Sequence, residues 1–189
     1  MEGQGKRKLL AGIERIILTG FRATGKSSVG RELSRRLEFD FIDTDILLGR
    51  QTGCSVAEFV ARHDWEAFRA LERTVLAGLV DSKKVVIATG GGAVLHHDVW
   101  KRLRQHSVVI WLQADVQTVR QRLSLDSHSE TQRPSLSGSD PQREIDTLLA
   151  EREPHYRSRS DFAVNTIGRT PEELAEEIMH HLDIIILNF

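Results

Sequence analysis

The segment Gly20–Ser27 constrains this chain more than any other, because it satisfies the pattern G-x-x-x-x-G-K-[ST]. A β-branched apolar run over 13–19 precedes it and predicts a buried strand, while apolar residues at helical spacing predict a helix over about 25–38. In this setting the glycines let backbone N–H groups converge on phosphate oxygens, and the helix start adds partial positive charge. The segment therefore predicts a nucleoside-triphosphate site, and an accidental glycine-rich turn does not explain its surroundings.

Two polar residues of this loop have a predicted chemical task. Lys26 would supply an ammonium group to the β- and γ-phosphates, and the Ser27 hydroxyl would ligate Mg²⁺. The predicted nucleotide-binding residues are Arg22, Ala23, Thr24, Gly25, Lys26, Ser27 and Ser28. Small-molecule kinases, GTPases and ATP-driven switches share the motif, but a chain of 189 residues has little room for an effector domain. The length favours a small kinase.

Short apolar runs alternate with helical patterns along the rest of the chain, which predicts a three-layer α/β fold with a central parallel sheet of about five strands. Further strands are expected over 39–43, 85–89, 108–112 and 162–165. Helices are expected over 98–105, 116–123, 141–160 and 171–182, with a helical pattern over 55–80 that breaks near 63–64. We expect a flexible leader at 1–12, one kinase domain over 13–182 with a substrate-binding helical segment at about 45–75, and an apolar tail at 183–189.

Composition limits the partners. The chain has 26 Lys plus Arg against 27 Asp plus Glu, a formal net charge of −1, which argues against binding nucleic acid through bulk positive charge. No apolar run approaches the roughly 18 residues of a membrane span, and the polar start lacks a secretory signal. Cys54 is the only cysteine, so an intrachain disulfide is excluded. We expect a cytoplasmic monomer that binds neither nucleic acid nor membranes.

Two carboxylates follow the second predicted strand, at the sheet edge where open α/β proteins bind ligands. On an extended segment, Asp43 and Asp45 would point the same way, so one could hold a metal through water while the other accepts a proton from an attacking hydroxyl. The alternative, which carries equal weight, is that an aspartate here caps the helix that follows.

Arginine and glycine residues further along the chain predict ligand contacts. Arg69 and Glu72 lie three residues apart on a helix, so Arg69 could clamp a substrate carboxylate, or the two could form an ordinary surface ion pair. Gly90, Gly91 and Gly92 follow a strand and allow the backbone to approach a ligand closely.

Two more arginines lie near the end of the domain. The Ser-rich segment over about 124–140 predicts a lid, in which Arg133 would stabilise transition-state charge or be a solvated loop arginine. Arg152 lies in a charge cluster whose default interpretation is a solvated face. The adjacent histidines His96 and His97 are expected at the surface, because neighbours on a regular element diverge.

Taken together, these motifs resemble the shikimate kinase family over nearly the whole chain, from Ile16 to about Leu182. The interval between motifs is more specific than any motif alone. The matching elements are Gly20–Ser27, Asp43-Thr44-Asp45, Phe68-Arg69 with Glu72, Gly90–Gly92, Arg133-Pro134, Arg152 with Pro154 and Tyr156, Asp161 with Val164 and Thr166, and Arg169-Thr170-Pro171.

The resemblance implies an enzyme that uses MgATP to phosphorylate the 3-hydroxyl of shikimate, on the route to chorismate and the aromatic amino acids. It implies that Asp45, Arg69, Gly91 and Arg152 bind shikimate, with Gly90 and Gly92 beside them and both arginines on the carboxylate. It further implies that Asp43 reaches Mg²⁺ through water, that Arg133 contacts the ATP phosphates, and that Arg169 lies by the adenine. Lys26, Asp45 and Arg133 are then the expected catalytic residues.

Two positions depart from the family pattern. Ala23 stands where a further glycine is frequent, and 126–130 carries Asp126 and Glu130 where many relatives have an arginine with glycines. An acidic lid would attract ATP less strongly. The alternatives are another small-metabolite kinase, such as a gluconate kinase, or a nucleotide-dependent regulatory protein with weak catalysis.

Overall fold

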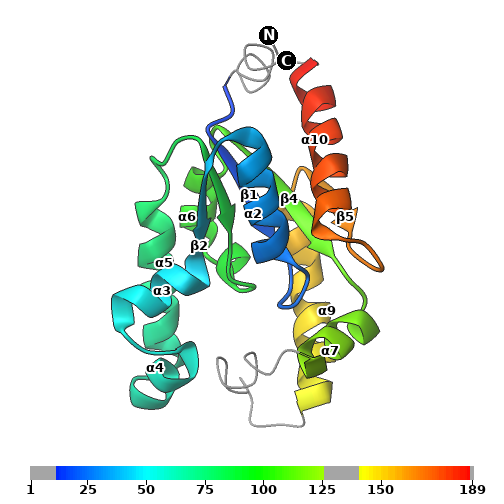
Figure 1. The fold of residues 1–189 in the computed structure, drawn as a ribbon. Coiled ribbons are helices and arrows are strands. Elements are labelled where there is room, and N and C mark those ends of the chain that lie inside the picture. The colour runs from blue at the N-terminus through cyan, green and yellow to red at the C-terminus, as the bar shows by residue number, and fades with distance from the viewer. Residues whose placement is uncertain (1–11, 126–140, 188–189) are drawn as a thin grey trace.

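A computed structural model of the chain describes residues 12–125 and 141–187. The α/β prediction is confirmed, because five parallel strands form one sheet in the order β2-β3-β1-β4-β5 with helices on both faces (Figure 1). The strands are β1 (Arg15–Thr19), β2 (Asp40–Asp43), β3 (Val85–Ala88), β4 (Ser107–Gln113) and β5 (Phe162–Asn165).

Burial on both faces explains why the inner strands are continuous apolar runs in the sequence. Ile16 and Leu18 of β1 pack into one core cluster with side chains of α2 (Lys26–Leu37) and α10 (Pro171–Leu187). Ile17, between them, packs into a second cluster on the opposite face, with side chains of α5 (Trp65–Gly78), α6 (His97–Leu103) and α9 (Pro141–Arg159). The alternation along one strand thus sends neighbouring residues to different cores.

The helical segment expected at about 45–75 consists of α3 (Thr44–Thr52), α4 (Val56–Arg62) and the first part of α5. Gly53, with φ 67°, ends α3, and Ser55 begins α4 through a capping box with Glu58. Leu48 and Phe68 bury the contact between these helices. Figure 1 shows α3, α4 and α5 on one side of the predicted phosphate loop (Gly20–Ser27), and α7 (Val116–Leu125) and α9 on the other.

The final helix extends further than predicted. It runs to Leu187, five residues past the expected end at Leu182, so most of the apolar segment expected as a separate tail is helical. No glycine or proline interrupts this run, and a single Asp183 does not stop a helix. Ile185 packs against the core while Ile184 is 45% exposed.

The lid expected over about 124–140 begins inside α7, which ends at Leu125, and the rest of it, 126–140 with Arg133, lies outside the described residues, as does most of the expected leader. Among the helices of 12–125 and 141–187, we find none with the length and apolar character that crossing a bilayer requires.

Because every strand runs the same way, their carboxyl ends share one edge of the sheet. The order β2-β3-β1 brings together the segments that follow these three strands: Asp43-Thr44-Asp45, Gly90–Gly92 and the phosphate loop. Topology therefore assembles residues from three distant parts of the chain at one place.

Candidate active site

The phosphate loop has the backbone conformation of an anion cradle. Gly20, with φ 136°, lies so close to the Leu112 carbonyl that no Cβ would fit, and Ala23 takes a left-handed conformation at φ 59°, which glycine adopts without steric cost. Gly25 precedes α2 without a side chain to cap it. The first N–H groups of a helix have no partner within it, so α2 offers donors to an anion at this end.

A single backbone carbonyl binds two polar side chains of the loop. The Phe21 carbonyl accepts hydrogen bonds from the Thr24 hydroxyl at 2.8 Å and from the Lys26 ammonium at 2.6 Å. Thr24 is buried and braces the loop from inside, whereas Lys26 is half-buried. The lysine is thus held over the loop, as the phosphate interpretation requires.

Asp43 joins the phosphate loop to α3. Its Oδ2 accepts a hydrogen bond from the Ser27 hydroxyl at 2.5 Å, while its Oδ1 accepts from the N–H groups of Asp45 and Ile46 at 3.0 and 3.3 Å as the N-cap of α3. The predicted extended placement of Asp43 and Asp45 is therefore wrong, because Asp45 lies in the first helical turn. The cap interpretation is confirmed, and the same carboxylate also reaches the loop hydroxyl.

The oxygen atoms of Ser27 and Asp43 are hard donors of the kind that Mg²⁺ prefers, and their contact places them side by side. The two residues fit a magnesium site completed by water and phosphate oxygens. Elsewhere, no three His, Cys, Asp or Glu side chains within 12–125 and 141–187 gather as a protein-only metal site.

A cavity of about 410 Å³ opens beside these groups. It is lined by Ser27, Asp43, Asp45, Ile46, Gly49, Ser55 and Val56. The structure thus brings the Asp45 carboxylate into the same cavity as the loop serine, although the two residues belong to different helices.

Arg69 of α5 is enclosed on several sides. Its Nη1 donates to Glu72 Oε2 at 2.6 Å, and its guanidinium carbon lies 5.6 Å from the Trp65 ring centre and 5.5 Å from that of Phe68. The interpretation as a surface ion pair is wrong, because Glu72 is only 1% exposed. Trp65 was not predicted to take part, since a tryptophan at the start of an amphipathic helix is indistinguishable from a core residue.

Glu72 has a second partner that the sequence did not predict. His96 Nε2 lies 2.9 Å from Glu72 Oε2, and the His96 side chain is only 10% exposed. The expectation that both adjacent histidines face solvent is wrong for this one, because their divergence turns His97 outward and His96 inward. Burial would raise the pKa of Glu72, but the hydrogen bond with His96 and the charge of Arg69 outweigh it and lower that pKa below 4.5.

The glycine run, Gly90–Gly92, lies between Arg69 and Arg152, the two arginines that could bind a substrate carboxylate. A Cβ on Gly91 would lie 3.4 Å from Arg152 Nη1, and a Cβ on Gly92 would overlap the Arg69 guanidinium. The Gly90 N–H donates to the Thr44 hydroxyl at 2.9 Å, which ties the run to the start of α3. The glycines therefore give both guanidinium groups their space.

Arg152 comes from α9, on the far side of the glycine run. It is 7% exposed, so the solvated-face interpretation is wrong, and its guanidinium carbon lies 5.9 Å from the Phe21 ring centre in the phosphate loop. One turn later, the buried Tyr156 hydroxyl donates to the Gly91 carbonyl at 2.6 Å and fixes α9 against the run.

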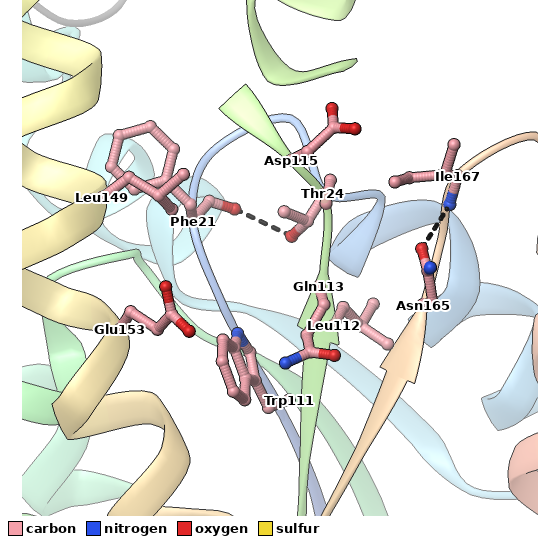
Figure 2. Close-up of a pocket in the computed structure, with 11 residues that line it drawn as sticks. Phe21, Thr24, Trp111, Leu112, Gln113, Asp115, Leu149, Glu153, Asn165 and Ile167 are labelled. Carbon is pink, nitrogen blue, oxygen red and sulfur yellow. Dashed lines mark hydrogen bonds between the residues drawn. The ribbon is translucent and has the colours of Figure 1, made fainter. Parts of the chain in front are cut away.

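A second cavity, of about 270 Å³, lies on the other side of the phosphate loop. Figure 2 shows Phe21 and Thr24 from that loop, Leu149 and Glu153 from α9, and side chains at the ends of β4 and β5 around it. Asn165 Oδ1 accepts a hydrogen bond from the Ile167 N–H at 3.0 Å, which shapes the segment after β5.

Arg122 of α7 is a site residue that sequence reasoning missed. Its guanidinium donates to the Ala23 carbonyl at 3.2 Å and to the Thr166 carbonyl at 2.6 Å, so it connects the phosphate loop to the segment after β5. No motif spacing distinguishes it from its neighbours on α7. Arg169, predicted by the adenine, lies in the segment after β5 and pairs with Glu177 of α10.

Comparisons with known proteins agree with one another. The family model for shikimate kinase matches residues 22–183. Shikimate kinase 2 of Yersinia enterocolitica is 41% identical over 167 residues, 88% of this chain and 94% of the relative. The solved structure of shikimate kinase from Acinetobacter baumannii in complex with shikimate is 30% identical, with a TM-score of 0.83 over 93% of this chain and 94% of that one.

A gluconokinase structure from Sinorhizobium meliloti also superposes, with a TM-score of 0.57 over 93% of this chain and 94% of that one. At 17% identity, this likeness shows a shared fold and nothing more. The comparisons therefore favour a shikimate kinase over the alternative of a gluconate kinase.

The lowered pKa of Glu72 predicts how stability depends on pH. The stability that this carboxylate contributes is fully present above about pH 5 and is lost as the pH falls through its folded-state pKa. We expect the free energy of unfolding of the wild type to exceed that of Glu72→Gln by the largest amount above about pH 5, and this difference to narrow as the pH falls. Urea unfolding at a series of pH values measures the difference, and a constant difference contradicts the prediction.

Proposed function

The chain belongs to the shikimate kinase family, and on this premise we propose that Lys26, Asp45 and two arginines carry out phosphoryl transfer to shikimate at the shared edge of the sheet. The activity is transfer of the γ-phosphoryl group of ATP to the 3-hydroxyl of shikimate, which yields shikimate 3-phosphate and ADP. What remains to be assigned is the task of each residue.

The observation that supports the assignment most is the position of Arg69 and Arg152 on either side of the glycine run. Shikimate is a small ring acid, so it requires cations for its carboxylate and acceptors for its hydroxyl groups. Both guanidinium groups lie against Gly91–Gly92, and the run itself contacts Thr44 at the start of α3, next to Asp45. We assign the carboxylate to the two arginines and the reacting hydroxyl to Asp45.

In the proposed reaction, Asp45 accepts the proton of the 3-hydroxyl, and the hydroxyl oxygen forms a bond to the γ-phosphorus. The bond from that phosphorus to the β–γ bridging oxygen breaks, and ADP leaves with the electron pair. Lys26 and the start of α2 balance the charge on the transferred group. Catalysis therefore depends on positioning and on charge, because phosphoryl transfer requires little covalent chemistry of the protein.

We assign Mg²⁺ to Ser27 directly and to Asp43 through water. The hydrogen bond between them places a hydroxyl and a carboxylate oxygen at one point beside the phosphate loop. A bound Mg²⁺ would neutralise negative charge on the β- and γ-phosphates.

The nucleotide phosphates are assigned to the loop residues from Arg22 to Ser28, and the base to the segment after β5, near Arg169. Arg122 supports this assignment, because it links the loop to that segment. The contact of Arg133 with ATP stays a prediction from the family resemblance. The weakening of ATP binding by the acidic segment 126–130 stays a prediction from its charge.

We further propose that the enzyme works as a cytoplasmic monomer with a single kinase domain that extends from about residue 13 through α10, and that it binds neither nucleic acid nor membranes. The nearly balanced charge of 26 basic against 27 acidic residues supports this proposal.

A coupled assay of ADP release with shikimate, with gluconate and without an acceptor tests the activity. We expect release that depends on shikimate and on Mg²⁺. Release with gluconate alone, or release that needs no acceptor, would contradict the proposal and favour one of the two alternatives.

Asp45→Asn should remove nearly all turnover while ATP still binds, because the amide cannot accept the proton. General base catalysis is worth about 10²- to 10⁴-fold, so kcat should fall within that range. The control Asp81→Asn changes an exposed aspartate between α5 and β3 and should leave kcat unaltered. A near wild-type kcat for Asp45→Asn rules out the role given to this residue.

Arg69→Ala and Arg152→Ala should each weaken shikimate binding by about 30-fold or more, since each removes a largely desolvated cation from a carboxylate. Calorimetric titration measures the affinity. Arg73→Ala and Arg157→Ala, exposed neighbours on the same two helices, serve as matched controls that should bind normally. Unchanged affinity in both Arg69→Ala and Arg152→Ala rejects the carboxylate assignment.

A further inference from the structure

His96 lies where two parts of the site meet, although it does not line the cavity beside Asp45. It follows η1 (Ala93–Leu95) and is the N-cap residue of α6, four residues after Gly92. Its Nε2 lies 2.9 Å from Glu72 Oε2, the same oxygen that accepts the hydrogen bond from Arg69. An ionised carboxylate only accepts hydrogen bonds, so the His96 Nε2 must carry a proton.

The turn that carries His96 also carries the glycine run. Consecutive backbone hydrogen bonds connect the Ala93 N–H to the Gly90 carbonyl at 3.0 Å, the Leu95 N–H to the Gly92 carbonyl at 2.9 Å, and the His96 N–H to the Ala93 carbonyl at 3.2 Å. The bond from His96 to Glu72 therefore joins α5 to the turn that carries the glycine run. The Arg69 guanidinium lies beside this bond, against Gly92.

Glu72 has few other means of holding its position. Its Oε1 is buried and makes no hydrogen bond among the described residues, so Arg69 and His96 are the partners that orient the carboxylate there. Without the His96 donor, the Glu72 carboxylate would lose the partner that fixes its position. It would then move together with the long, half-buried Arg69 side chain and no longer hold that side chain in place. Arg69 cannot shift toward Gly92, since the two are already in close contact.

We propose that His96 is a positioning residue, which sets the affinity of the site for the shikimate carboxylate by holding Glu72 and, through it, Arg69. This inference rests on the proposed role of Arg69 in binding the carboxylate. It assigns no contact with substrate to His96. The competing explanation is that His96 only offsets the cost of burying Glu72, in which case its loss lowers the melting temperature and leaves substrate binding intact.

Steady-state kinetics of His96→Leu and His96→Gln distinguish these explanations. Leucine removes the donor, whereas a glutamine amide can donate from nearly the position of Nε2. We expect His96→Leu to raise the KM for shikimate by roughly 5- to 30-fold, with kcat and the KM for ATP within about twofold of wild type. This is less than the full loss of one hydrogen bond to a charged group, because His96 acts on the substrate only through Glu72 and Arg69. His96→Gln should restore the KM to within about threefold.

His97→Leu is the matched control, because His97 is the exposed neighbour, and its KM for shikimate should stay at the wild-type value. In the Arg69→Ala background, His96→Leu should add less than about twofold to the KM, since the effect passes through the missing arginine. A normal KM in His96→Leu, or an equal increase with and without Arg69, overturns the proposal.

The same set separates this inference from the function on which it rests. If Arg69→Ala leaves the KM for shikimate unchanged, the role of Arg69 itself fails. If Arg69→Ala raises that KM and His96→Leu does not, only the positioning role of His96 fails.

A measurement on the wild type covers the case in which His96→Leu does not fold. The ¹⁵N chemical shifts of the His96 ring should show a protonated Nε2, because that atom donates to Glu72. An Nε2 without a proton overturns the proposal whatever the variants do.

Discussion

The buried ion pair between Arg69 and Glu72 is the interaction on which the proposed site depends. Removing both charges from water is costly, and an imperfect environment would leave the pair destabilising. Here Glu72 receives a second hydrogen bond from His96, and the guanidinium rests against two aromatic rings. The arginine keeps 27% of its side-chain surface exposed, so a substrate carboxylate can still reach it.

The topology of the sheet places this ion pair beside the other residues of the proposed site. Because β3 lies between β2 and β1, the glycine run leaves the sheet between the Asp43–Asp45 segment and the phosphate loop. Gly92 then leaves room for Arg69 on one side, and Gly91 faces Arg152 of α9 on the other. A metal-binding pair, a base, two cations and a phosphate cradle therefore meet at one edge, although 132 positions separate Gly20 from Arg152.

Local patterns in the sequence predicted most of the fold. Apolar runs placed the three inner strands, which are buried, and shorter mixed segments placed the edge strands β2 and β5. The glycine-rich loop was recognisable from its setting between a strand and a helix. What could not be predicted are contacts between segments that are remote in sequence. The pairing of His96 with Glu72 spans 24 positions, and that of Arg122 with Ala23 spans 99. The helix boundary at Asp43 was left open between two interpretations for a different reason, because an aspartate that ends a strand and caps a helix fits both patterns.

A crystal structure with shikimate and a non-hydrolysable ATP analogue tests the central claim most directly. The account predicts that the shikimate carboxylate lies within hydrogen-bonding distance of both Arg69 and Arg152, with the 3-hydroxyl between Asp45 and the terminal phosphate. A ring acid bound elsewhere, with its carboxylate on neither arginine, would contradict it.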